Sequence, residues 1–165
     1  MASTEQLGYS QAQIVLHWTI AALVIFQLLF GESMGAVRRA AFRHATASPT
    51  DQLMASLHYW FGIAILVLAV IRLAVRLVKG TPPSVGLSPL AVRAAELAHA
   101  LFYLLLVLVP VTGLLGYYFG DPWGDLHTLG KPAFIVLIAI HASAALFHQF
   151  WIKDGTMRRM LVPRS

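Results

Sequence analysis

The main pattern along the chain is four long apolar segments separated by short polar stretches. They cover about residues 11–30, 53–77, 90–118 and 132–151. Each is near or above the roughly 20 residues that a helix needs to cross a hydrocarbon core of about 30 Å. Because lipid cannot satisfy free backbone N–H and C=O groups, helices are the expected form. The pattern therefore predicts an all-α fold, a transmembrane four-helix bundle.

The polar stretches contain signals that end or begin helices. Thr81-Pro82-Pro83 is expected to end the second helix, and Ser88-Pro89 is typical of an N-cap followed by proline at the first helical position. The segment 120–124, Gly-Asp-Pro-Trp-Gly, breaks the chain between the third and fourth helices. Since no internal repeat or low-complexity run is present, residues 1–165 are expected to form a single domain.

Composition supports a membrane protein. Hydrophobic residues make up 58% of the chain and charged residues 12%, whereas a soluble protein has about a quarter charged residues. The net charge of +5 is not a sign of nucleic-acid binding, because the basic residues lie between the apolar segments. The lipid bilayer is thus the expected partner, and no nucleic acid is expected. The absence of cysteine excludes disulfides, thiolate zinc sites, iron–sulfur clusters and covalently attached haem.

The distribution of basic residues predicts the orientation. With four spans, both termini share a side with the loop between the second and third helices. That side has eight basic residues and the other has four. The eight are Arg72, Arg76, Lys79, Arg93, Lys153, Arg158, Arg159 and Arg164, and the four are Arg38, Arg39, Arg43 and Lys131. The positive-inside rule then places both termini on the cytoplasmic side.

Histidines inside the predicted spans are the candidate functional residues, since ionisable groups in a membrane are costly. His17 lies about a turn inside the cytoplasmic face and His58 about a turn inside the outer face. His127, at the start of the fourth helix, is level with His58. His141 follows fourteen residues later, which is about 21 Å deeper and about 40° from the same helix face. Depth therefore pairs His58 with His127 and His17 with His141.

Two facing imidazoles with no acidic partner at their depth favour six-coordinate haem b, because a zinc site usually needs four ligands. The alternative is that each histidine is a hydrogen-bonded core residue. Pro132 leaves open which direction His127 faces relative to His141. If the fourth helix starts at Pro132, His127 lies in the preceding turn.

Four further residues are candidate contacts of the haem expected between His17 and His141, near the cytoplasmic face. His148 lies seven residues past His141 on the same face, where it can replace His141 as ligand or bind a propionate. His99 is expected to contact a propionate or to support a ligand. Arg72 and Arg76 share a face of the second helix and either reach lipid headgroups or pair with propionates.

These residues and their flanks resemble the bacterial cytochrome b561 family of two-haem membrane proteins over nearly the whole chain. The resemblance rests on the segment Ile14-Val15-Leu16-His17-Trp18, on Leu57-His58 with Gly62 and Leu66, on Arg72-Leu73-Ala74-Val75-Arg76, and on His127, Ile140-His141-Ala142, His148 and Trp151-Ile152-Lys153-Asp154.

The resemblance implies axial ligands at His17, His58, His127 and His141, two non-covalent haem b groups, electron exchange with membrane quinone and a multi-pass protein of the bacterial inner membrane. Length and layout are most similar to superoxide oxidases, which pass an electron from superoxide to ubiquinone. The expected function is therefore a superoxide:ubiquinone oxidoreductase. The alternative is a cytochrome b electron-transfer subunit of a membrane hydrogenase or dehydrogenase, which receives its electron from another one-electron donor.

The charges of the outer face do not favour superoxide strongly. Four basic residues there face four acidic ones, Glu32, Asp51, Asp121 and Asp125, so no net positive field attracts an anion. The local cluster from Arg38 to Arg43 in the first loop can still attract superoxide.

Overall fold

The computed structural model describes residues 8–82 and 88–163, and the regular structure in these ranges is helical. In chain order the helices are α1 (Gln11–Phe30), α2 (Glu32–Phe42), α3 (Pro49–Lys79), α4 (Pro89–Phe119), α5 (Trp123–Thr128), α6 (Gly130–Phe147), the π-type turn η2 (His148–Ile152) and α7 (Thr156–Arg159).

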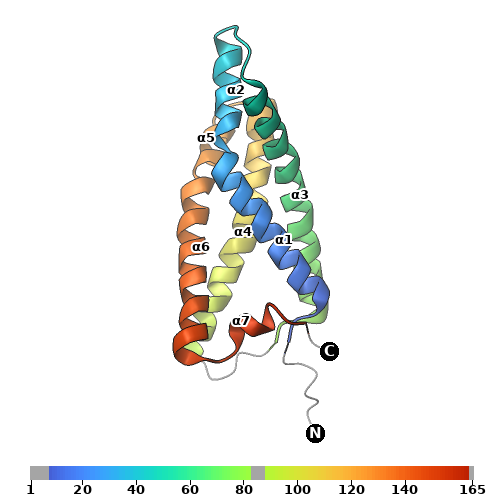
Figure 1. Ribbon diagram of the computed structural model, residues 1–165, viewed down its shortest axis with the longest axis vertical. Coiled ribbons are helices and arrows are strands. Elements are labelled where there is room, and N and C mark those ends of the chain that lie inside the picture. The colour runs from blue at the N-terminus through green and yellow to red at the C-terminus, as the bar shows by residue number, and fades with distance from the viewer. Residues whose placement is uncertain (1–7, 83–87, 164–165) are drawn as a thin grey trace.

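Four stretches of the described chain are long and apolar enough to cross a membrane. They are α1, α3, α4 and the run Trp123–Ile152, which joins α5, α6 and η2. Figure 1 shows them as one elongated bundle in which α1 begins, and α7 lies, at the same end. We call this the terminal end and the opposite one, where α2 meets the start of α3, the hairpin end. The all-α, four-span prediction is confirmed.

The helix boundaries differ from the prediction at the hairpin end. The second span begins at Pro49 rather than at residue 53, because Ser48 caps it by accepting a hydrogen bond from the Asp51 N–H at 3.1 Å. The first loop, for which no element was predicted, contains the helix α2. The fourth span does not start at Pro132. α5 precedes that residue, which lies within the first turn of α6, where proline costs no hydrogen bond.

The predicted signals around the third span have the expected effect. Ser88 caps α4 by accepting a hydrogen bond from the Ala91 N–H at 3.3 Å, and Pro89 follows it at the first helical position. Gly120 ends α4 at φ 75°, a left-handed conformation that favours glycine. Pro83 and Arg164 lie outside the described residues.

The buried core is a thin apolar layer at mid-depth. It is formed by Ile20, Val24, Ile65, Ala69, Leu106 and Phe134. Apolar side chains elsewhere on the spans point outward: Val67, Leu104 and Ile140 expose 52%, 51% and 58% of their surface. Such exposure in the middle of long helices requires an apolar solvent, because water disfavours continuous apolar surfaces of this size.

A C-terminal strap, residues 153–162, crosses the terminal end of the bundle and includes α7 (Figure 1). Its far side is attached to α1, where Trp18 Nε1–H donates to the Met160 carbonyl at 2.9 Å. The strap therefore joins the last span to the first across the bundle.

Replacing Trp18 with phenylalanine should loosen this strap. A single hydrogen bond contributes about 1 kcal/mol, so the open strap should become about fivefold more populated. Trypsin cleavage after Arg158 should accelerate by the same factor in W18F. Trp60→Phe, the same substitution on an exposed position of α3, serves as the control. Equal cleavage rates in the wild type and W18F would contradict the role of this bond.

Candidate functional site

The hairpin-end pair consists of His58 on α3 and His127 on α5. Their ring centres are 5.9 Å apart and their planes are nearly perpendicular, at 89°. His127 Nδ1 lies 2.8 Å from the Val109 carbonyl oxygen, to which it donates. This bond fixes the tautomer, so that Nε2 of His127 carries a free lone pair.

α4 is shaped to receive the His127 ring. Pro110 lies inside α4, and the buried Thr112 hydroxyl is 2.8 Å from the Leu108 carbonyl and 3.0 Å from that of Val109. At Gly113 the ring and the backbone are so close that a Cβ would lie 2.9 Å from both Nδ1 and Cε1 of His127. Only glycine leaves room for this approach.

The terminal-end pair consists of His17 on α1 and His141 on α6. Their ring centres are 6.4 Å apart, with planes at 62°. Arg72 Nη1 lies 2.6 Å from His17 Nδ1 and donates to it. The structure therefore brings together both pairs that the sequence predicted from depth, and it places one of the two predicted arginines against the terminal-end pair.

A third imidazole lies beside the terminal-end pair. The ring of His99 on α4 is centred 5.8 Å from that of His141, and Phe102 packs edge-on to His141 at 5.2 Å. His17 and His141 belong to the first and last spans. His99 reaches His141 from α4, which packs against α6. The position of His99 suits the predicted supporting contact.

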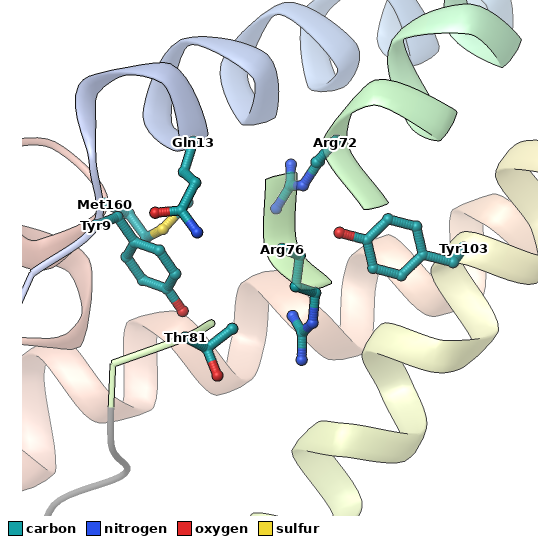
Figure 2. Close-up of a pocket in the computed structure, with 7 residues that line it drawn as sticks. All are labelled: Tyr9, Gln13, Arg72, Arg76, Thr81, Tyr103 and Met160. Carbon is teal, nitrogen blue, oxygen red and sulfur yellow. The ribbon is translucent and has the colours of Figure 1, made fainter. Parts of the chain in front are cut away.

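Arg72 and Arg76 also line a small cavity of about 20 Å³ at the terminal end. Figure 2 shows both guanidinium groups and the Tyr103 hydroxyl directed into the same region. The other lining residues are Tyr9, Gln13, Thr81 and Met160 of the strap. A space of this size holds one water or one small polar group, and its guanidinium groups favour an anionic one.

His148 has a partner of its own. Its Nδ1 lies 2.6 Å from Asp154 Oδ2, and Asp154 also accepts a bond from the Thr156 N–H at 2.9 Å. Burial alone would raise the pKa of Asp154, but the hydrogen bonds from Thr156 and His148 outweigh it and lower that pKa to about 2. The carboxylate is thus ionised at neutral pH, and the structure uses His148 to hold the start of the strap.

The geometry of both pairs suits a metal between the rings. A metal–nitrogen bond of about 2 Å on each side, plus about 1 Å from nitrogen to ring centre, separates two ligating imidazoles by about 6 Å. Among residues 8–82 and 88–163, no group of three or more His, Cys, Asp or Glu is placed to hold a metal ion. Two imidazoles alone suit six-coordinate haem iron rather than zinc.

A four-span bundle with facing imidazole pairs defines the class of membrane-bound b-type cytochromes. The model of the family described as prokaryotic cytochrome b561 matches residues 8–163. The chain belongs to this family.

Three relatives cover nearly all of the chain. Cytochrome b562 of Cereibacter sphaeroides is 38% identical over 98% of this chain and 99% of its own. A Yersinia pestis protein named probable superoxide oxidase CybB is 31% identical over 93% of this chain and 95% of its own. Cytochrome b561 homolog 1 of Escherichia coli is 29% identical, covering 95% and 98%. The protein is thus a membrane electron-transfer cytochrome whose family binds b-type haem.

Two groups near the hairpin-end pair were not predicted from the sequence. The Val109 carbonyl belongs to the backbone and has no residue-specific signal. Gln27 on α1 did have one, because it is an amide within an apolar run of a span.

Replacing Gly113 with alanine should push His127 away from α4. Such overpacking typically costs about 1–3 kcal/mol, which corresponds to about a 5- to 160-fold weaker haem affinity at the hairpin end. The haem content of purified protein, measured as the pyridine adduct, should fall in G113A. Gly35→Ala is the control, since its Cβ would meet only the flexible end of Arg39. Full haem content in both variants would contradict the close approach.

Proposed function

We propose that this protein carries electrons across the bacterial inner membrane through two haem b groups, one between each histidine pair. The observation that supports this most directly is the separation of the two pairs of ring centres, 5.9 Å and 6.4 Å. The pairs lie on either side of the thin apolar layer around Ile65 and Leu106. Two redox centres in tiers, one near each surface, suit stepwise transfer of single electrons.

The residues present fit this cofactor. His58 and His127 would hold one haem and His17 and His141 the other, and each haem supplies reversible one-electron chemistry when bound. A ligating His17 Nε2 leaves the proton on Nδ1, which then cannot accept from Arg72. Arg72 therefore needs a new acceptor, and the cavity that it shares with Arg76 suits a propionate carboxylate. His99 would support the same haem from α4.

The proposed reaction oxidises superoxide and reduces ubiquinone. Two superoxide anions give up one electron each and leave as dioxygen, and the two electrons with two protons convert one ubiquinone to ubiquinol. The relative named as a probable superoxide oxidase supports this reaction. Arg38 of α2 lies near α5, the helix that carries His127: its Nη1 is 3.4 Å from the Cβ position of Gly124. Asp121 Oδ1 lies 2.9 Å from the same position, so the charges there are balanced and the support for superoxide comes from the relative.

The same proposal fixes the orientation. The terminal end, with its excess of basic residues, would face the cytoplasm, and the hairpin end would face outward. Superoxide formed outside the cell membrane would then donate its electron at the hairpin end.

A second candidate is an electron-transfer subunit that takes electrons from a protein partner such as a hydrogenase or dehydrogenase. The relative with 38% identity, which is named only as a cytochrome, leaves this function open. The near balance of charge at the hairpin end also favours it, because the site then needs no attraction for an anion.

Substitutions in the two pairs should each remove one haem. His58→Ala and His127→Ala should each lower the haem content from two to one per chain, and so should His17→Ala and His141→Ala, because an axial ligand is lost in each. His44→Ala, at an exposed position, is the control. The pyridine adduct measures the content. Retention of both haems in H141A together with loss in H148A would overturn the proposed terminal-end ligands.

The reaction itself can be tested without oxygen. Adding a superoxide source to the purified oxidised protein should produce the reduced α-band of b-type haem within the mixing time, and added ubiquinone should restore the oxidised spectrum. Superoxide dismutase added beforehand should abolish the reduction. A spectrum that superoxide leaves oxidised, but that a co-purifying protein partner reduces, would favour the subunit.

A further inference from the structure

Gln27 connects α1 to α3 next to the hairpin-end pair. Its side-chain Nε2 donates to the backbone carbonyl of His58 at 2.7 Å. The amide lies beside Gly62, one turn further along α3, where a Cβ would be 3.5 Å from Nε2. Because Nε2 must face the carbonyl, the amide orientation is fixed, and Oε1 is the atom left for another contact.

Two buried side-chain atoms in the described part of the chain have no hydrogen-bond partner in the protein. They are Oε1 of Gln27 and Nδ1 of His58. Buried polar atoms are almost always bonded, and an unbonded one costs about 1–3 kcal/mol. Both unbonded atoms belong to residues that are already joined by the bond between Gln27 Nε2 and the His58 carbonyl.

When His58 ligates iron, the two unbonded atoms are chemically complementary, one a donor and the other an acceptor. A ligating Nε2 puts the proton of the neutral ring on Nδ1, which then needs an acceptor. The amide Oε1 is an acceptor that needs a donor. His127, the opposite member of the pair, already has such an acceptor in the Val109 carbonyl.

Gly31 packs closely against the His58 ring and the Gln27 carbonyl. A Cβ on Gly31 would lie 3.3 Å from Cε1 and 3.4 Å from Nδ1 of His58, and 2.7 Å from the Gln27 carbonyl oxygen. Polar atoms therefore surround this glycine on two sides. Oε1, Nδ1 and the Gln27 carbonyl provide the two to four polar partners that a buried water requires.

We propose that Gln27 is the positioning residue of His58, and that its amide oxygen accepts the Nδ1 proton through one bridging water. This inference rests on the proposed function, because it requires His58 to ligate a haem. The two ligands of the hairpin-end haem are then held by different groups: a backbone carbonyl directly for His127, and a side-chain amide through water for His58.

Such a contact has a redox consequence. An acceptor on Nδ1 increases the electron donation of the imidazole, which stabilises ferric iron and lowers the reduction potential. Removing the acceptor should therefore raise the potential of the hairpin-end haem and leave the terminal-end haem unchanged. A role limited to packing predicts no such selectivity.

The test is a spectroelectrochemical titration of the detergent-purified, haem-loaded protein. The two transitions are assigned by comparison with H127A, which lacks the hairpin-end haem. Gln27→Met, which has a similar length but no amide oxygen, should shift the hairpin-end transition to higher potential. Gln27→Glu, which keeps an acceptor oxygen in either protonation state, should give a transition at or below that of the wild type.

Gln52→Met is the matched control. Gln52 also lies at the hairpin end and also donates from Nε2 to a backbone carbonyl, that of Ala47 at 2.8 Å, but it is exposed. Q52M should leave both transitions in place. An unchanged hairpin-end transition in Q27M, or an equal upward shift in Q27M and Q27E, would overturn the role of Gln27.

Haem content separates this outcome from failure of the proposed function. If Q27M loses the hairpin-end haem, the result for Q27E tests the role of Gln27. Two haems in Q27E, with a hairpin-end potential at or below that of the wild type, would support the inference. Loss of that haem from Q27E would overturn it. If H58A keeps both haems, the ligand assignment itself fails. If the potentials are unchanged in Q27M and one haem is lost in H58A, the positioning role of Gln27 is rejected and the ligand assignment stands.

Discussion

The structure depends on holding two pairs of imidazoles close together within an apolar bundle. An imidazole in such a setting is stable only if each ring nitrogen has a partner, because neither lipid nor an apolar core can bond it. The pairs meet this requirement unequally. One nitrogen of His127 bonds the Val109 carbonyl, one of His17 faces Arg72, and Nδ1 of His58 has no protein partner.

The surrounding helices are shaped around these rings. Gly113 removes the side chain that would strike His127, and the part of α4 next to Pro110 presents the carbonyl that orients it. The terminal end is closed differently, by the strap that joins the last span to the first. Close backbone contacts thus define one end of the bundle, and the strap lies beside the arginine-lined cavity at the other.

The thin core also explains how a small chain can carry redox chemistry through a membrane. Ile65 and Leu106 lie in the layer that separates the tiers, and apolar side chains outside that layer face lipid rather than the interior. The bundle needs little self-packing where cofactors fill its interior and lipid covers its outside. The family relationship agrees with this arrangement, because relatives that cover almost the whole chain are named as cytochromes or as a superoxide oxidase.

Apolar segments of sufficient length, separated by prolines and glycines, determined the four helices from sequence alone, because lipid permits little else. The 14-residue spacing of His127 and His141 similarly indicated two tiers, since a helix converts spacing into depth. The sequence did not reveal that α2 and α5 are helices of their own, nor that His148 Nδ1 is paired with Asp154. Only the tertiary structure decided the partners of the ring nitrogens, because the Val109 carbonyl and the Arg72 guanidinium reach the histidines from other helices. Side-chain spacing within one helix carries no information about such contacts.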